Sequence, residues 1–427
     1  MDKSEIKNSI LEMGAQARAA AHALAILSSE EKNSILRAMA AGLREHESRI
    51  LEANKLDIEA GESNGLTSAM LDRLRLAPSR LESIAAGIEQ VADLPDPVGE
   101  VLDEWERPNG ITIQQIRVPI GVIGMIYESR PNVTSDAAVL CLKSGNATIL
   151  RGGSEAIHSN KAIAAALQAG GESAGLPENA IQLIPFTDRE SVSVMAGMDK
   201  WLDVIIPRGG KGLIEAVVSL ARMPVIKHYD GICHTYVDKD ADLNMAVAIV
   251  DDAKTHKPGV CNALETLLVH EEVAEEFLPK IAAVFTEKGV EMRGDARTCE
   301  ILGDAAVVAS DEDWDTEYLD LIIAIKVVAG ISDAIDHINT HSSGHSECIV
   351  TTDSQRAESF ITRIDSACVF HNVSTRFSDG AEFGFGAEIG ISTDKLHARG
   401  PMALRELTSY QYRIRGNGQT RTLNATT

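Results

Sequence analysis

The stretch best suited to covalent chemistry is residues 257–266, in which Cys261 follows Pro258 and Gly259. Proline and glycine mark a tight turn, and the apolar residues at 265–270 predict a buried strand directly behind it. A cysteine held between a turn and a strand can face a cleft, where its thiolate would attack an electrophilic carbon. The alternative is a packed core cysteine, because free cysteine is among the residue types most often buried.

A second candidate site is the glycine pair Gly209 and Gly210, which follows a predicted strand at 204–207 and opens a predicted helix at 210–222. Glycines there let backbone N–H groups approach a phosphate, and a helix N-terminus favours negative charge. The segment is neither a P-loop, because no Ser or Thr follows Lys211, nor a GxGxxG loop. An ordinary turn is therefore the alternative.

Two polar side chains, Arg151 and Asn132, also stand after predicted strands. Arg151 ends the strand at 147–151, where its guanidinium would suit a ribose 2′-phosphate and favour NADP over NAD. Asn132 follows the strand at 122–127 and could donate an amide hydrogen bond to a developing oxyanion. The alternatives are a surface arginine and a helix N-cap.

Two histidine- and glycine-rich segments carry weaker patterns. His337, His341 and His345 recur every four residues, as on a metal-binding helix face. Residues 342–344 (Ser-Ser-Gly) would break such a helix, so we expect a loop and no metal. The glycines at 379–386 lack the strand-to-helix context of a nucleotide loop and are more typical of a loop that closes over a site.

Composition narrows the class of protein. The chain has 427 residues, 44% hydrophobic but only 4% aromatic, which favours a helix-rich α/β protein of two or three domains. A net charge of -23 argues against a nucleic-acid-binding surface. The six cysteines form no CxxC pair, and no signal segment or membrane-length apolar run is present, so we expect a cytoplasmic protein without membrane contact.

The order of predicted elements gives the domain organisation. Helices fill residues 1–95, with a capping box at Ser28 and Glu31, and strands alternate with helices from residue 121 onward. This alternation predicts parallel sheets that are covered on both faces and bind ligands at their carboxyl edges. The strand at 111–118 and the tail at 409–415 both alternate with period two, so they could pair as a protruding arm.

The predicted strands of the second α/β block are residues 234–237, 265–269, 322–328, 348–351 and 367–371. We therefore expect a nucleotide-binding domain at 1–224 with an arm strand at 105–119 inserted. A catalytic domain carrying Cys261 would occupy 225–403, and residues 404–427 would form a C-terminal arm.

Taken in order, these pieces resemble the aldehyde dehydrogenase superfamily from about residue 10 to 415. The landmarks are residues 119–122 (Pro-Ile-Gly-Val), Pro131-Asn132, 144–146 (Ser-Gly-Asn), a basic residue at 151, Gly209-Gly210 and Cys261. The sequences of 127–134 and 258–266 resemble those of the superfamily's acyl phosphate reductases. The resemblance implies an α/β fold with two doubly wound, Rossmann-like lobes and a β arm for oligomerisation.

The resemblance also implies residue roles. Cys261 would be the nucleophile and Asn132 its oxyanion partner, while Glu317 would hold the nicotinamide ribose. Arg151 stands where many relatives carry a lysine on the adenosine ribose. The anionic groups of a substrate need cationic or N–H partners; the candidates are Arg130, Ser374, Thr375, Arg376 and Arg399.

One departure from the superfamily pattern is informative. Hydrolytic members carry a glutamate before a Gly-Gly pair, a little over thirty residues ahead of the cysteine. Here that segment is 227–232, and His228 takes the glutamate's place by spacing. A glutamate would activate water to hydrolyse a thioester, so its absence suits a reductase. His228 or Asp230 could still act as a base.

The implied activity is the NADPH-dependent reduction of L-glutamyl 5-phosphate to L-glutamate 5-semialdehyde in proline biosynthesis, with phosphate released through a Cys261 thioester. The alternatives are a CoA-acylating aldehyde dehydrogenase and a catalytically silent family member. The implied partners are further copies of the chain, in a homo-oligomer, and glutamate 5-kinase, from which the substrate could be channelled.

Overall fold

The computed structural model describes residues 3–421, which form two compact units. The first unit contains the described chain up to Ile226, together with Phe385–Gly390 and the chain from Met402 onward. The second contains Lys227–Gly384 and Ile391–Pro401. In the described part of the chain, no helix is long and apolar enough to cross a membrane.

The first unit opens with a helical layer. The predicted capping box is confirmed at the start of α2: the Ser28 hydroxyl accepts from the Glu31 N–H, and the Glu31 carboxylate accepts from the Ser28 N–H. Leu36, Met39 and Leu43 of this helix are buried, at the helical spacing of an amphipathic face. The helices are α1 (Lys3–Leu24), α2 (Ser29–Glu45), α3 (Glu47–Ser63), α4 (Ser68–Leu74) and α5 (Pro78–Asp93).

A parallel sheet of order β5-β4-β3-β6 forms the core of the first unit. The chain adds β4 and β5 on one side of β3 and then β6 on the other, so the strand order reverses between β3 and β6. Ligands of open α/β sheets bind at the carboxyl edge beside such a reversal. The strands are β3 (Val122–Tyr127), β4 (Ala147–Gly152), β5 (Ile181–Leu183) and β6 (Val204–Arg208).

The strands β3 and β4 are buried along their whole length, as expected of parallel strands with helices on both faces. The predicted parallel sheet is therefore confirmed for this unit. The intervening helices are α6 (Asn132–Lys143), η1 (Ser154–Ala156), α7 (Ile157–Glu172), α8 (Arg189–Ala196) and α9 (Lys211–Leu220).

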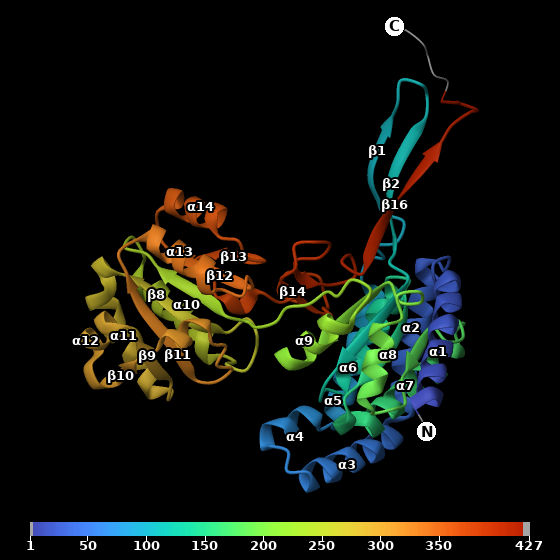
Figure 1. Cartoon of the computed structure of the whole chain (residues 1–427), viewed down its shortest axis with the longest axis horizontal. Helices are drawn as coiled ribbons and strands as arrows, with labels where there is room; N and C mark the ends of the chain where they lie inside the picture. The colour runs from blue at the N-terminus through green and yellow to red at the C-terminus, as the bar shows by residue number, and fades with distance from the viewer. Residues whose placement is uncertain (1–2, 422–427) are drawn as a thin grey trace. The chain divides into compact units, whose positions relative to one another are not determined.

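The predicted arm pairing is also confirmed, as Figure 1 shows. Strand β16 (Thr408–Arg415) lies antiparallel to β2 (Thr112–Pro119), with Tyr410 opposite Arg117 and Ile414 opposite Ile113. A further strand, β1 (Val101–Glu106), pairs with the other edge of β2. Tyr410, Tyr412 and Ile414 are more than half exposed on this sheet.

The second unit is built on a parallel sheet of order β10-β9-β11-β8-β7-β12-β13. A hydrophobic cluster in this unit includes Phe277 and Phe285 of α11. The strands are β7 (Cys233–Val237), β8 (Leu264–His270), β9 (Glu291–Gly294), β10 (Ala306–Val308), β11 (Ile322–Val328), β12 (Ser346–Val350) and β13 (Cys368–His371).

The connections of this sheet are helical. They are α10 (Leu243–Thr255), α11 (Glu271–Glu287), α12 (Ala296–Leu302), η2 (Gly303–Ala305), η3 (Asp311–Asp315), α13 (Ile331–His341), α14 (Ser354–Arg363) and η4 (Thr375–Phe377). Beyond the sheet, β14 (Gly390–Ser392) pairs with β15 (Gly400–Met402).

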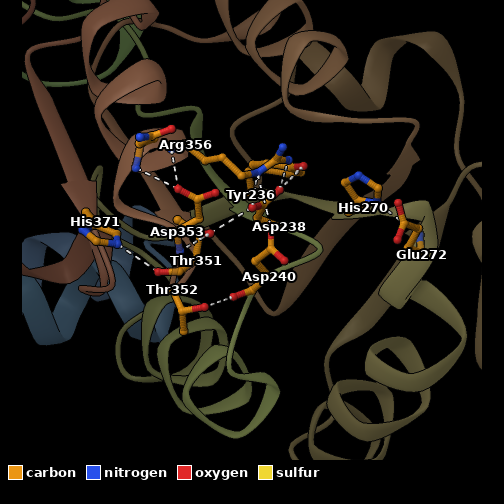
Figure 2. Close-up of polar contacts among 11 residues, drawn as sticks. Tyr236, Asp238, Asp240, His270, Glu272, Thr351, Thr352, Asp353, Arg356 and His371 are labelled. Carbon is orange, nitrogen blue, oxygen red and sulfur yellow. Dashed lines mark hydrogen bonds and ion pairs between the residues drawn. The ribbon is translucent and has the colours of Figure 1, made fainter.

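The two edges of this sheet carry different polar residues. At the carboxyl edge, the buried Asp238 accepts from the Tyr236 hydroxyl (2.8 Å), the Thr351 hydroxyl (2.9 Å) and Arg356 Nε (2.6 Å), which ties β7, β12 and α14 together (Figure 2). Cys261 precedes β8 and therefore lies at the opposite, amino edge.

Candidate active site

Cys261 lies in the predicted turn, three residues ahead of β8, and is half-buried. Among the described cysteines only Cys261 and Cys299 keep appreciable exposed surface. Burial raises the pKa of the Cys141 and Cys348 thiols to about 12, so these two stay protonated near neutral pH. The exposure of Cys261 disfavours the alternative of a packed core cysteine.

Glu317 and Gly231 lie against the Cys261 segment. All three precede neighbouring strands, Glu317 before β11, Cys261 before β8 and Gly231 before β7, so they meet at the amino edge of the sheet. Glu317 Oε1 accepts from the Gly231 N–H at 2.9 Å. A Cβ at Gly231 would lie 2.1 Å from the Cys261 carbonyl oxygen, so only glycine fits here. That oxygen also accepts from Cys233 Sγ at 3.2 Å.

Three of the predicted substrate residues also reach this segment. The Thr375 hydroxyl donates to the Asn262 carbonyl at 2.8 Å, and the Arg376 guanidinium contacts the Asn262 side-chain oxygen. The Ser374 hydroxyl accepts from the Arg376 N–H and caps η4. The structure thus brings Ser374, Thr375 and Arg376 together beside the residue that follows Cys261.

Arg399 lies in a separate cavity of about 460 Å³ in the second unit. Its guanidinium donates to the Asp365 carboxylate at 2.9 Å, and Lys395 contacts the same carboxylate. Ser343 lines the cavity and accepts from the Ile232 N–H at 2.9 Å. The fifth predicted substrate residue, Arg130, is exposed in the first unit, ahead of α6.

The histidine-containing segments pack into the second unit. The rings of His228 and His345 meet edge to face with centroids 5.7 Å apart, and burial lowers the pKa of His345 to about 3. The expected loop is wrong for His337 and His341, which lie on α13; the helix ends at His341, and only His345 lies beyond it. Within residues 3–421 no three His, Cys, Asp or Glu side chains are arranged to hold a metal ion.

Asn132 is the first residue of α6, so the N-cap alternative is wrong. Its Nδ2 donates to Asp136 Oδ2 at 2.8 Å, one turn along the helix. An asparagine amide carries two hydrogens, which leaves the second for another acceptor. Asp136 is half-buried, and burial raises the pKa of its carboxyl group to about 6, while Asn132 and Arg208 oppose the shift.

This raised pKa predicts a pH-dependent stability. Between its ordinary pKa of 3.8 and about 6, Asp136 holds a proton in the folded protein that the unfolded chain has lost. Stability therefore falls as pH rises through this window, by up to about 3 kcal/mol. Asp136→Asn should remove this fall when urea unfolding is compared at pH 4 and pH 7. Asp199→Asn, at an exposed position, is the matched control, and an unchanged fall in Asp136→Asn would contradict the expectation.

The predicted cofactor residues of the first unit lie at the carboxyl edge of its sheet. Arg151 is 8% exposed, which excludes the surface-arginine alternative, and it donates to the Thr187 carbonyl (2.9 Å) and the Ser191 hydroxyl (3.2 Å). Gly210 N–H donates to Glu128 Oε2 at 2.9 Å, so a carboxylate already sits at the start of α9. Space beside Gly210 and Gly212 is open.

Sequence reasoning missed several residues of this site. Gly231 and Cys233 contact the Cys261 backbone, and the Asn262 side chain donates to the Arg376 carbonyl at 3.3 Å; spacing alone reveals none of these contacts. Lys254 and Glu265 form an ion pair behind it. The one available indication was a charged residue, Glu265, inside a strand predicted to be buried.

The model of the aldehyde dehydrogenase family matches residues 5–299, and the chain belongs to that family. The predicted fold class is thereby confirmed. An acetylating aldehyde dehydrogenase from Geobacillus thermoglucosidasius, 18% identical over 98% of this chain and 99% of that chain, shares the fold with a TM-score of 0.67.

Relatives with higher sequence identity indicate the group within the family to which the chain is similar. Proteins named gamma-glutamyl phosphate reductase from Moorella thermoacetica and Paramagnetospirillum magneticum are 56% and 54% identical, covering 96% and 99% of this chain and 97% and 99% of their own lengths. The crystal structure of gamma-glutamyl phosphate reductase from Thermotoga maritima is 48% identical over 96% of this chain and 99% of that chain, with a TM-score of 0.95. The chain is thus an oxidoreductase that groups with these reductases.

Proposed function

We propose that this chain reduces L-glutamyl 5-phosphate to L-glutamate 5-semialdehyde with release of phosphate, in proline biosynthesis, through a thioester on Cys261. The names of the similar proteins support the substrate. The observation that carries the chemistry is the partly exposed Cys261 near Glu317, together with His228 in the place of the glutamate that would activate water. A thioester formed there would persist long enough to be reduced.

In the proposed mechanism the Cys261 thiolate attacks the acyl carbon of the substrate and forms a tetrahedral oxyanion. The Asn132 amide and the Cys261 N–H stabilise that oxyanion, and the C–O bond to phosphate breaks as the carbonyl re-forms. NADPH, when bound, would supply the hydride that reduces the thioester carbon. The resulting hemithioacetal on Cys261 collapses, which releases the aldehyde and returns the thiolate.

The chain's residues fit a nicotinamide dinucleotide. The first unit offers a strand-order reversal, a buried arginine at 151 and open space beside Gly210, near Gly209, at the start of α9. We assign the adenosine ribose to Arg151, the phosphates to Gly209 and Gly210, and the nicotinamide ribose to Glu317. The substrate's anionic groups are assigned to Arg130, Ser374, Thr375, Arg376 and Arg399.

The preference for NADPH over NADH should depend on Arg151. A charge-assisted hydrogen bond to a 2′-phosphate is worth about 1.5 to 3 kcal/mol, so Arg151→Gln should lower the ratio of kcat/KM for the two nucleotides by roughly 10- to 100-fold. Ser191→Ala, which removes a partner of Arg151 but keeps the cation, serves as the control. An unchanged ratio in Arg151→Gln would place the 2′-phosphate elsewhere.

One spectrophotometric assay separates this function from its alternatives. Oxidation of the semialdehyde with NADP should require inorganic phosphate. A requirement for CoA instead would indicate an acyl-CoA reductase. A protein that neither binds a dinucleotide nor shows selective alkylation of Cys261 would be a catalytically silent member. Assembly into a homo-oligomer through the exposed arm and substrate transfer from glutamate 5-kinase remain predictions from the family resemblance.

A further inference from the structure

Behind the Cys261 segment lies a fully buried ion pair that the proposed mechanism does not use. Glu265 is the second residue of β8, and Lys254 lies in the last turn of α10. Both side chains have 0% exposed surface, and Lys254 Nζ lies 2.6 Å from Glu265 Oε2. Because burying two charges offsets much of the gain from pairing them, such a pair is poorly explained by stability alone.

The other carboxylate oxygen of Glu265 holds a strained loop. Glu265 Oε1 accepts from the Leu319 N–H at 3.2 Å. Leu319 has a φ of 55°, in the left-handed region that a bulky residue rarely adopts, so the surrounding contacts must hold it there.

Tyr318, the neighbouring residue, is anchored as well. Its hydroxyl donates to Asp313 Oδ1 at 2.8 Å, and Lys254 Nζ and the Arg293 guanidinium lie 5.9 and 5.2 Å from its ring centroid. Both members of the ion pair therefore contact the loop at 316–321.

The same loop carries Glu317, and its contacts connect the loop to the Cys261 segment at two points. Glu265 follows Cys261 by four residues along the chain and binds the Leu319 N–H. Glu317, two residues before Leu319, binds the Gly231 N–H, and Gly231 packs on the Cys261 backbone. The position of the Glu317 carboxylate relative to Cys261 is thus set by Glu265 on one side and by Gly231 on the other.

We propose that Glu265 and Lys254 are positioning residues that fix the Glu317 carboxylate relative to Cys261. This inference rests on the proposed function, in which Glu317 holds the nicotinamide ribose. Glu265 touches no reacting atom and acts through the Leu319 N–H. Its loss should therefore loosen the 316–321 loop and weaken dinucleotide binding, and should leave the nucleophilicity of Cys261 largely intact.

Two double variants isolate the positioning contact. Lys254→Met/Glu265→Gln removes both charges but keeps an oxygen that can accept from the Leu319 N–H. Lys254→Met/Glu265→Leu removes both charges and the acceptor. The loss of the ion pair, with any fall in Tm that it causes, is common to both. The structural difference between them is the hydrogen bond to Leu319.

Hydrogen exchange of the peptide containing Leu319 is measured without cofactor, followed by the Kd for NADPH and the iodoacetamide labelling rate of Cys261. We expect exchange about tenfold faster and a Kd about tenfold higher in the Leu double variant than in the Gln one, as for loss of a hydrogen bond of typical strength, with similar labelling rates. Arg356→Met breaks the ionic contact at the opposite edge of the same sheet (Figure 2). It should lower Tm without changing the exchange rate of the Leu319 peptide or the Kd for NADPH.

Equal exchange in the two double variants would overturn the proposal, whatever their affinities. If the loop loosens but Glu317→Ala leaves the Kd for NADPH unchanged, the positioning inference stands and the ribose role of Glu317 is wrong. Should the Leu double variant not fold, Lys254→Met/Glu265→Met removes the same acceptor of the Leu319 N–H with an unbranched side chain closer in shape to glutamate. Exchange faster than in the Gln double variant would then support the proposal, and equal exchange would overturn it.

Discussion

Cys261→Ala should lose turnover by about 10⁴-fold or more, because removal of a covalent nucleophile leaves only binding and oxyanion stabilisation to lower the barrier. The measurement is kcat for semialdehyde oxidation with NADP and phosphate. NADPH binding and Tm should stay close to those of the unmodified protein, because the substitution only replaces a half-buried side chain in a turn with a smaller one.

Cys299→Ala is the matched control for this loss. Cys299 is the other partly exposed cysteine among the described residues, and its thiol donates to the Gly294 carbonyl at 3.4 Å, away from the Cys261 segment. It should keep near-normal turnover. Near-normal phosphate-dependent turnover in Cys261→Ala would show that the reaction does not pass through this thiol.

Asn132→Ala should lower kcat by about 10² to 10³-fold, the usual effect of losing one oxyanion donor. The labelling rate of Cys261 by iodoacetamide should change little, because alkylation at a saturated carbon develops no oxyanion. The two readouts together separate loss of transition-state stabilisation from loss of a reactive thiol.

Two outcomes would contradict this role of Asn132. A fall in labelling as large as the fall in kcat would mean that the substitution disturbs Cys261 itself. A loss in kcat of less than about fivefold would leave Asn132 with only its bond to Asp136, since one oxyanion donor should contribute more than that.

Elements with strong periodicity were predictable from the sequence. The period-two patterns at 111–118 and 409–415 predicted two strands, and these pair as β2 and β16. The apolar run at 322–328 is β11 with the same bounds, and the strand behind Cys261 is β8 within one residue at each end. The turn before Cys261 followed from Pro258 and Gly259 alone.

Short or polar elements were not predicted, because they lack a periodic or continuous apolar pattern. Strand β9 has only four residues, Glu291–Gly294, two of them charged, and its place in the sheet comes from its neighbour β11. The helix through His337 and His341 ends at His341 with Ser342 as its C-cap, so the Ser-Ser-Gly segment terminates it and does not prevent it.

Within the candidate site, the sequence indicated residue types but not their partners. Asn132 bonds Asp136 rather than capping its helix, and Glu128 occupies the Gly210 N–H that was expected to face a phosphate. The ion pair of Lys254 and Glu265 joins a helix to a strand, and its second contact, to Leu319, is 54 residues away in the chain. Such contacts depend on which strands become neighbours, which local patterns do not specify.

The central claim, a covalent acyl group on Cys261, is tested most directly by intact-protein and peptide mass spectrometry. The protein is incubated with L-glutamate 5-semialdehyde and NADP in the absence of phosphate. The account predicts one glutamyl group in thioester linkage on the peptide containing Cys261, released when inorganic phosphate is added. An unmodified Cys261 under conditions in which NADPH forms, or the same adduct in Cys261→Ala, would contradict it.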